Sequence, residues 1–217
     1  MDKPKDEIEK ELPRLTDALS DKDRRRVEQA TVRLVKTGSR GVLAPGEFIF
    51  SATHCIPWRG TGTMALGEVY PIQIETASGV NFRLGAHACD PVADIAALGE
   101  LDNQQCPDDA DHFKEWRGQV EPVPLCYRRI KPGQVEPVFI YTHKDEWIEG
   151  SVTRYGRDIP YSSVALSVSR IESGTSGSPV VTADGLLLGI VSHDERMPVC
   201  AMAVPRWVLD RVKRGKR

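Results

Sequence analysis

Three side chains that together could transfer an acyl group lie in separate segments of the 217-residue chain. His54 follows the apolar stretch EFIF, Asp94 precedes the apolar run IAAL, and Ser176 lies in the turn GTSGSP. Serine-based acyl transfer requires a nucleophile at an exposed turn, a histidine that accepts its proton, a carboxylate that orients the imidazole, and backbone N–H groups for the oxyanion. The order His, Asp, Ser, with these residue types in these contexts, predicts that chemistry.

The turn around Ser176 is not decisive by itself. Gly174 and Gly177 allow backbone conformations closed to other residues and a close approach to a substrate. A turn rich in glycine and serine also joins the strands of an ordinary hairpin. Likewise, a single histidine is usually structural and a single aspartate usually caps a turn. It is the combination of all three residues that favours catalysis.

Short strand-like segments, separated by Gly, Pro, Ser and Asn, extend from about residue 28 to about 204. No helix-length periodic segment alternates with them, which argues against a parallel βαβ sheet and predicts an all-β barrel or sandwich. The turns Ser78-Gly79 and Asp184-Gly185 punctuate the pattern. The strand-like segments are ATVRLV, GEFIFSAT, VYPIQIET, VNFRLG, PVFIY, WIEGSVTRY, SSVALSVS, SPVVTA and GLLLGIVS.

Three other segments interrupt or flank this β region. An apolar face of Ile8, Leu12, Leu15 and Leu19 predicts an amphipathic helix over about 6–20. The acidic, proline-containing segment 102–124 divides the β region into two parts, and we expect a connection between lobes there. The end of the chain, from Pro205, predicts a closing helix followed by a basic tail.

Composition excludes several other classes of function. With 29 Lys and Arg against 31 Asp and Glu, the net charge of −2 argues against a strongly basic nucleic-acid binder. No apolar stretch approaches the ~18 residues of a membrane helix, and the first twenty residues contain no secretion signal. The five cysteines are scattered without a C-x-x-C pair, and no phosphate-binding glycine motif occurs. We therefore expect a cytoplasmic protein with no metal, no organic cofactor, and no nucleic-acid or membrane partner.

The segments ATHC (52–55), DIAAL (94–98) and GTSGSP (174–179) resemble three signatures of the chymotrypsin-like, or trypsin-like, serine peptidases. Those signatures are A-x-H-[CV], D-[IL]-A-x-L and G-x-S-G-[GS]-P, and their style here is closest to the bacterial HtrA/Deg-like branch. GLLLGIVS followed by AMAVP also resembles the segment after the nucleophile. The resemblance covers about 30–213, and no PDZ domain is expected because the sequence stops at Arg217.

The resemblance implies two antiparallel six-stranded β-barrels, and the residue patterns described above add an N-terminal and a C-terminal helix. Residues 1–27 would form the charged N-terminal helix, and 28–213 the peptidase domain. The implied parts of that domain are an N-lobe (about 28–105), a linker (about 102–124), a C-lobe (about 124–204) and the closing helix (205–213), before a basic tail (214–217).

By the same resemblance, Ser176 is the nucleophile, His54 the general base and then acid, and Asp94 the residue that orients the imidazole. The N–H groups of Gly174 and Ser176 would form the oxyanion hole. Asp90 is the alternative carboxylate; we favour Asp94 because Asp90 precedes a proline and lacks the apolar run.

The resemblance also implies which residues set substrate preference, and for Arg170 an alternative role stays open. Ser192 would lie in the strand that pairs with the substrate backbone, with His193 and Asp194 near the primary specificity pocket and Arg170 at its floor. Arg170 and His193 would then favour an acidic side chain before the scissile bond. Alternatively, Arg170 pairs with Glu172, Asp194 or another internal carboxylate.

Two departures from the family concern activation and disulfides. Thr175 stands where zymogen-activated members have an aspartate, so activation by a newly cleaved N-terminus is not expected. Cys55 resembles a cysteine that forms a disulfide in secreted members, but Ser39 and Arg40 stand near its partner's expected place. The resemblance therefore implies no such disulfide here.

The sequence thus predicts a serine endopeptidase that acts on polypeptides through an acyl-enzyme, with a regulatory or substrate-presenting protein as a further partner. The alternative is a peptide-binding module that captures an extended peptide by strand addition with little or no catalysis. An α/β-hydrolase is excluded, because Ser178 occupies the last glycine of G-x-S-x-G and strands do not alternate with helices.

Overall fold

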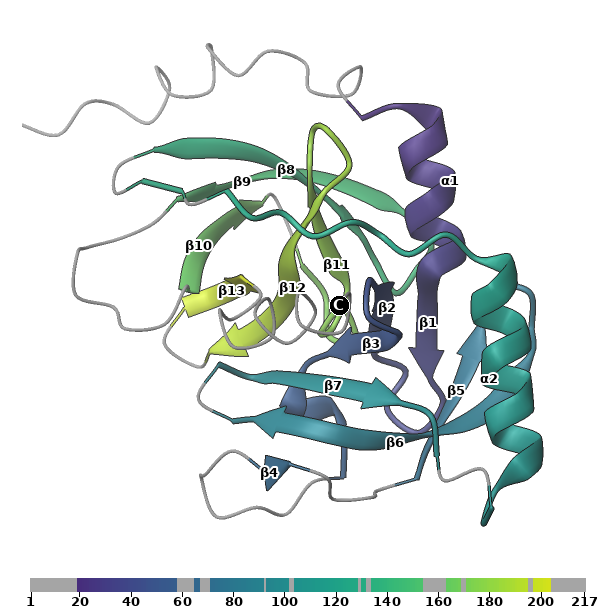
Figure 1. The fold of residues 1–217 in the computed structure, drawn as a ribbon. Helices are drawn as coiled ribbons and strands as arrows, with labels where there is room; N and C mark the ends of the chain where they lie inside the picture. Colours follow the sequence, from purple (N-terminus) through teal and green to yellow (C-terminus); the bar gives the residue numbers. More distant parts are fainter. Residues whose placement is uncertain are drawn as a thin grey trace, which may run out of the picture.

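The computed structural model describes residues 19–57, 65–66, 71–91, 93–101, 104–128, 130–131, 134–153, 163–168, 171–194 and 197–203. Its strands form two antiparallel assemblies, and two α-helices lie beside them (Figure 1). The helices are α1 (Asp21–Ala30) and α2 (Pro107–Gln119), with a short 3-10 helix, η3 (Thr53–Cys55). The prediction of a mainly β protein is therefore confirmed.

The first assembly is a seven-stranded sheet in the order β4-β6-β5-β1-β2-β3-β7, in which β6 also pairs with β7. Its register follows from alternation of apolar and polar residues, as in β5, where Ile72, Ile74 and Thr76 are buried. The strands are β1 (Thr31–Leu34), β2 (Arg40–Ala44), β3 (Phe48–Ser51), β4 (Ala65–Leu66), β5 (Ile72–Thr76), β6 (Asn81–Asp90) and β7 (Ile95–Gly99).

The second assembly is a closed barrel in the order β10-β13-β12-β11-β8-β9, completed by pairing of β9 with β10. The sequence predicts two six-stranded barrels; the structure shows this one and the seven-stranded sheet. The barrel strands are β8 (Val135–Tyr141), β9 (Trp147–Thr153), β10 (Ser163–Val168), β11 (Pro179–Thr182), β12 (Leu187–Asp194) and β13 (Met197–Ala203).

One apolar core joins the sheet to the barrel. Phe50 and Leu43 of the sheet belong to the same buried cluster as Phe139 and Leu187 of the barrel. The segment between the two assemblies is pinned to both, because Val123 N–H bonds to Leu43 O at 3.0 Å and the neighbouring chain exchanges backbone bonds with Leu187. A second, smaller cluster lies within the barrel. The two assemblies therefore share buried surface rather than touching at their rims.

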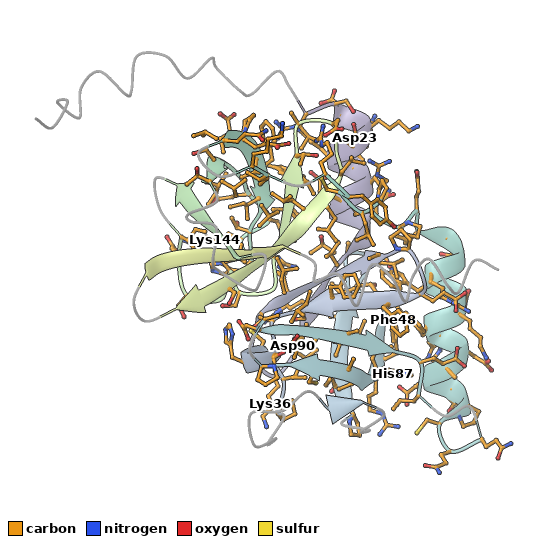
Figure 2. All side chains as sticks on the ribbon, turned by 60° about the vertical axis from the view of Figure 1, so that its left-hand side comes forward. Asp23, Lys36, Phe48, His87, Asp90 and Lys144 are labelled. Atoms are coloured by element: carbon orange, nitrogen blue, oxygen red, sulfur yellow. The ribbon has the colours of Figure 1, made fainter. Side chains whose placement is uncertain are left out.

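Helix α1 is not the helix expected over 6–20, whose residues 6–18 lie outside the described part of the chain. It begins after Ser20, whose hydroxyl oxygen accepts from Asp23 N–H at 3.1 Å. Of its side chains only Val27 and Ala30 are buried. Charged residues make its other contacts: Arg24 lies over the rings of Phe139 and Trp147 at 5.8 and 5.3 Å. Figure 2 labels Asp23 in the first turn of α1.

Helix α2 lies within 102–124, where we expect a connection between lobes from the sequence and name no helix. Pro107 lies at the start of the helix, where its missing N–H costs no hydrogen bond. Phe113 and Trp116 pack against Phe82 of β6, with ring centroids 5.8 and 5.9 Å from it. Asp109 accepts from the Arg83 side chain at 2.7 and 2.9 Å. The helix therefore packs on β6, and its two rings belong to the same buried cluster as the core of the sheet.

Two further observations complete the fold. The expected closing helix, 205–213, and the tail, 214–217, lie outside the described residues. Among the residues that the structure does describe, no helix has the length and apolar character needed to cross a bilayer.

Candidate active site

His54 lies in η3, directly after β3, which pairs with β2 and β7. Two bonds fix the backbone around it: Ser51 Oγ donates to Arg40 O at 2.7 Å, and Thr53 N–H donates to Asp94 O at 3.2 Å. The His54 side chain itself is 43% exposed. The imidazole is therefore anchored at its base and open to a ligand.

Asp94 ends the turn between β6 and β7, with a φ of 48° that aspartate tolerates better than most residues. Its Oδ1 accepts from the His54 N–H at 3.0 Å and its Oδ2 from His54 Nδ1 at 2.7 Å. The hydroxyl of Ser192, on β12 of the barrel, donates to the same Oδ2. Asp90 instead accepts from the N–H of Ala93 at 2.9 Å. Of the two candidate aspartates, it is Asp94 whose carboxylate contacts the imidazole.

The carboxylate sets the protonation and orientation of His54. The hydrogen bond from Nδ1 to Asp94 is the largest cause that raises the pKa of His54 from 6.5 to about 10, and a smaller contribution comes from a hydrogen bond with Cys55. Partial burial of the ring opposes the rise. Because Nδ1 is committed to the carboxylate, Nε2 is the ring nitrogen left to exchange a proton with another group.

The turn that carries Ser176 is pressed against the sheet. Ser176 O accepts from Arg40 N–H at 3.0 Å, and Gly177 N–H donates to Val191 O of β12 at 2.8 Å. Gly177 has a φ of 79°, and a Cβ there would lie 2.0 Å from Arg40 O and 2.7 Å from Ser51 Oγ. No side chain fits at this position. Glycine thus lets the turn approach the same strand end that carries His54.

Two backbone donors of the turn are unused. Within the part of the chain that the structure describes, the N–H groups of Gly174 and Ser176 have no hydrogen-bond acceptor. Their neighbours are paired, because Thr175 N–H bonds to Glu172 O at 3.2 Å and Ser178 N–H to Thr175 O at 3.0 Å. Unpaired N–H groups at a glycine turn are the donors that an oxyanion needs.

The relation of Ser176 to His54 differs from that of Asp94 to His54. Among the described residues, no hydrogen bond joins the Ser176 hydroxyl to the His54 imidazole. Such bonds are often long in unliganded enzymes and shorten when substrate binds. The structure thus brings His54, Asp94 and Ser192 into direct contact, and places Ser176 through backbone bonds of its turn.

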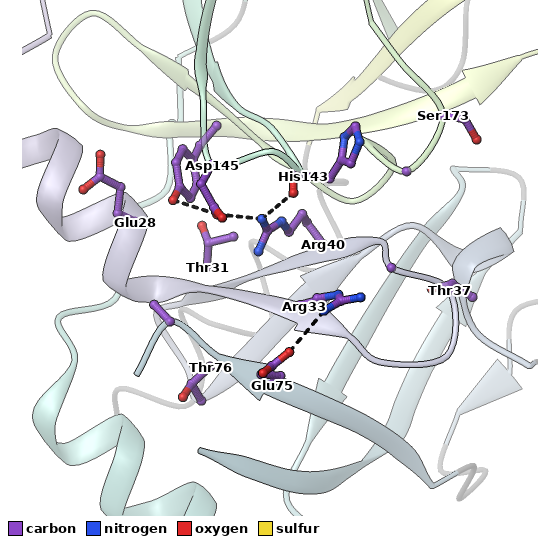
Figure 3. A pocket seen from close by; sticks show the side chains of 14 residues that line it. Glu28, Thr31, Arg33, Thr37, Arg40, Glu75, Thr76, His143, Asp145 and Ser173 are labelled. Atoms are coloured by element: carbon purple, nitrogen blue, oxygen red, sulfur yellow. Dashed lines mark hydrogen bonds and ion pairs between the residues drawn. The ribbon is translucent and has the colours of Figure 1, made fainter. Parts of the chain in front are cut away.

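A cleft of about 620 Å³ opens beside this turn (Figure 3). It lies between β1 and β5 of the sheet and the loop that joins β8 to β9, and Gly174 is part of its wall. Its sides carry the Arg33–Glu75 ion pair at 3.4 Å and the Arg40–Asp145 pair at 2.7 Å. Charged groups of both signs therefore line it in compensated pairs.

No protein-family model and no curated protein matches the sequence. Among solved structures, the chain is similar to the Rv3671c protease in an inactive form, with a TM-score of 0.55 and 15% identity over 90% of this chain and 93% of that one. It is also similar to a mutant of Rv3671c from M. tuberculosis H37Rv, in an inactive form, with a TM-score of 0.56 and 14% identity over 91% of this chain and 92% of that one.

The protein has a chymotrypsin-like fold. At these identities the likeness establishes the fold alone. A chymotrypsin-like fold agrees with the resemblance in sequence, whereas the HtrA/Deg-like branch stays a prediction.

Of the remaining predicted residues, the structure describes some side chains and not others. Ser192 is buried in β12, and its hydroxyl contacts Asp94. His193 and Asp194 continue β12, but their side chains lie outside the described part, as does all of Arg170. Glu172, an alternative partner of Arg170, forms an ion pair with Lys144 at 2.6 Å.

Sequence reasoning missed two residues beside the turn. Arg40 and His143 flank the cleft and contact the Ser176 turn, although each is far from Ser176 in sequence. No local pattern marks either of them. His87, by contrast, lies on the sheet beside Phe48 (Figure 2), with Nε2 2.7 Å from Glu100 O, and is structural. In the described residues, no cluster of three His, Cys, Asp or Glu side chains could hold a metal ion.

Proposed function

We propose that the protein is a serine endopeptidase that hydrolyses peptide bonds through Ser176, His54 and Asp94. The observation that carries this proposal is the 2.7 Å hydrogen bond from His54 Nδ1 to Asp94 Oδ2. That bond fixes the tautomer and the ring orientation that a general base requires. The unpaired N–H groups of Gly174 and Ser176, and the chymotrypsin-like fold, support the same assignment.

In the acylation step, Ser176 Oγ attacks the carbonyl carbon of the substrate while His54 Nε2 takes the hydroxyl proton. The carbonyl oxygen becomes an oxyanion and accepts from the N–H groups of Gly174 and Ser176. Asp94 stabilises the imidazolium that forms and remains ionised throughout. When the tetrahedral intermediate collapses, the C–N bond breaks and His54 returns the proton to the leaving amine.

Deacylation repeats these steps with water. His54 Nε2 accepts a proton from a water molecule as its oxygen attacks the Ser176 ester, and the same oxyanion site is used. Collapse of the second intermediate breaks the ester bond, and the proton passes back to Ser176. The enzyme is regenerated without a metal or an organic cofactor.

Several finer assignments belong to this proposal. We take the seven-stranded sheet, with its additional β6–β7 pairing, as the second barrel of the fold. The substrate is a polypeptide, a protein partner presents the substrate or regulates the site, and the enzyme acts in the cytoplasm. The HtrA/Deg-like branch is proposed on the three sequence signatures.

One observation favours the alternative of a peptide-binding module. Among the described residues, the Ser176 hydroxyl makes no hydrogen bond to His54. A site that stayed in this arrangement when occupied would bind a peptide without activating the serine. The two functions therefore differ in whether Ser176 reacts.

The deciding experiment is intact-mass spectrometry after treatment with a fluorophosphonate. We expect a single adduct on the wild type and none on Ser176→Ala, because only an activated serine attacks the phosphorus centre. Ser78→Ala is the matched control: it removes an exposed serine in the turn between β5 and β6 and should keep the adduct. No adduct on the folded wild type would favour the binding module instead.

A further inference from the structure

The conformation of the Ser176 turn depends on a residue between its two unpaired donors. Thr175 is only 1% exposed, although it lies in a polar turn. Its Oγ1 is 3.0 Å from Nδ1 of His143 and within hydrogen-bonding reach. A buried hydroxyl without a partner would be costly. This hydrogen bond therefore ties the orientation of Thr175 to the position of His143.

The ring of His143 also bounds the space around Gly174. A Cβ at Gly174 would lie 3.3, 3.4 and 3.6 Å from Cδ2, Cγ and Nε2 of that ring. Gly174 itself has a φ of +97°, which is strained for other residues. Figure 3 shows the His143 ring beside the chain segment that begins at Ser173. One side chain thus bonds to Thr175 and occupies the space beside Gly174, the two residues whose peptide groups precede Ser176.

His143 is held in turn by a buried arginine. Arg40 Nη2 donates to His143 O at 2.8 Å and to Asp145 Oδ1 at 2.7 Å, and Tyr141 donates to the same Asp145 oxygen at 2.9 Å (Figure 3). The backbone N–H of Arg40 bonds to Ser176 O. Arg40 therefore holds the Ser176 turn from one side and the loop that carries His143 from the other.

The loop contacts the turn at a second point. Lys144 Nζ is 2.6 Å from Glu172 Oε2, and Glu172 O accepts the Thr175 N–H. The ion pair is exposed, so it contributes little energy by itself. The β8–β9 loop, residues 142–146, therefore contacts the Ser176 turn at more than one point.

We propose that His143, held by Arg40, is the positioning residue that keeps the N–H groups of Gly174 and Ser176 unpaired and directed at a common acceptor. The inference rests on the proposed function, because the acceptor is the oxyanion of the acyl-transfer step. His143 does not contact the reacting atoms. It acts through Thr175 and Gly174, so its loss weakens stabilisation of the transition state and leaves the triad intact.

The test uses four variants of the full chain with p-nitrophenyl acetate as the probe. His143→Ala and Thr175→Val each remove one partner of the hydrogen bond, and we expect each to lower kcat by about 10- to 100-fold with little change in KM. Loss of a whole oxyanion donor costs about 10²- to 10³-fold, and a mispositioned donor should cost less. His143→Asn should recover most of kcat, because its amide reaches the place of Nδ1. Glu146→Gln, on the same loop with an exposed side chain, should match the wild type.

The double variant His143→Ala/Thr175→Val separates positioning from general damage. If the two residues act through one hydrogen bond, the double variant should lose no more activity than either single variant. A peptidyl trifluoromethyl ketone, which forms a tetrahedral adduct, should bind more weakly in proportion to the loss of kcat. Thermal unfolding of each variant establishes that the protein is folded.

Two outcomes overturn the inference and differ from failure of the proposed function. A folded His143→Ala variant with wild-type kcat would overturn it, and so would losses in the two single variants that multiply in the double variant. In both cases the fluorophosphonate adduct on wild-type Ser176 would still support the peptidase. Absence of that adduct would overturn the proposed function and this inference together.

Discussion

At the scale of single residues, the site depends on one carboxylate that receives several donors. Asp94 accepts the His54 backbone N–H, the His54 ring N–H and the Ser192 hydroxyl. The bond to the ring favours the protonated imidazole. Removing any one of these donors or the acceptor changes the basicity of His54 without touching Ser176.

Replacing the acceptor should have the largest effect. Asp94→Asn keeps the size of the side chain but presents an amide N–H or a neutral oxygen to His54, which stabilises the wrong tautomer. We expect kcat to fall about 10⁴-fold, which is the loss that this substitution causes in the Ser-His-Asp triad of other serine proteases. Asp90→Asn is the matched control, since Asp90 pairs with Ala93 N–H and not with the imidazole. Equal losses in the two variants would contradict the assignment.

The pH dependence follows from the raised pKa of His54. The base form of the imidazole exists above its pKa, so hydrolysis should increase as pH rises toward about 10. The protonated His54–Asp94 pair contributes stability that is fully present below pH 6.5 and is lost as pH rises through about 10. An NMR titration of the His54 ring measures this pKa directly. In Asp94→Asn the midpoint should move to lower pH, and an unchanged midpoint would argue against Asp94 as the cause.

Loss of the Ser192 hydroxyl tests the third donor. Ser192→Ala removes a buried hydrogen bond to Asp94 Oδ2 and leaves the carboxylate less stabilised. We expect about a tenfold decrease in kcat, because a hydrogen bond to a charged group is worth about 1.5–3 kcal/mol and only part of that acts in the transition state. Hydrolysis of p-nitrophenyl acetate measures it, and Ser192→Thr, which keeps a hydroxyl, is the comparison. Wild-type kcat in Ser192→Ala would remove Ser192 from the site.

The sequence predicted part of this site and could not predict the rest. The three signatures around His54, Asp94 and Ser176 implied, through the resemblance to chymotrypsin-like peptidases, that Asp94 orients the His54 imidazole. Arg40 and His143 carried no such signal, because each reaches the Ser176 turn from an element far away in sequence: Arg40 from β2 of the sheet, and His143 from the β8–β9 loop of the barrel. Contacts of that kind depend on how strands dock, and no local pattern encodes the docking.

At the scale of elements, the helices show where residue patterns mislead. The segment that forms α1, DKDRRRVEQA, lacks a continuous apolar stripe, and the guanidinium group of Arg24 lies over two aromatic rings of the barrel where leucines would be expected. In α2, the buried residues Ala110, Phe113 and Trp116 do recur at helical spacing. That spacing is present in the sequence, but the expectation of a connection between lobes at 102–124 did not draw on it.

The docking of α1 on the β11–β12 hairpin can be measured with two glycines. Gly185 has a φ of +72°, and a Cβ there would lie 2.6 Å from Cγ of Asp23; Gly79 has a φ of +81° with nothing within 4 Å. Both alanine variants incur the left-handed cost of about 1–2 kcal/mol. Gly185→Ala should lose about 1 kcal/mol more, because the new methyl group displaces Asp23. Urea denaturation measures the free energy of unfolding of both variants. Equal losses would mean that α1 moves away from this contact at no cost.

At the scale of the whole molecule, the shared core predicts a single unfolding transition. Side chains of the sheet and the barrel are buried in one cluster, and α1 packs on the barrel before the chain enters β1. Neither assembly can lose its structure without exposing apolar surface of the other. Tryptophan fluorescence and far-ultraviolet circular dichroism should therefore report the same midpoint in urea.

A variant of the sheet makes this test sharper. Phe82→Ala removes a buried ring of the sheet that packs on α2 and should cost about 3–5 kcal/mol. Both probes should shift together to a lower urea midpoint. Two separate transitions, with only one of them moved, would show that the assemblies unfold independently.

The contact of Ser192 with Asp94 joins residues that are far apart in the chain, and this separation matters while the ribosome synthesises the protein. His54 and Asp94 precede Ser176 and Ser192 in the chain, so the ribosome adds them earlier. A nascent chain that has folded only the sheet holds a histidine and an aspartate but no nucleophile. Under the proposed function, the enzyme cannot cut its neighbours before the segment that carries Ser176 has been translated and folded.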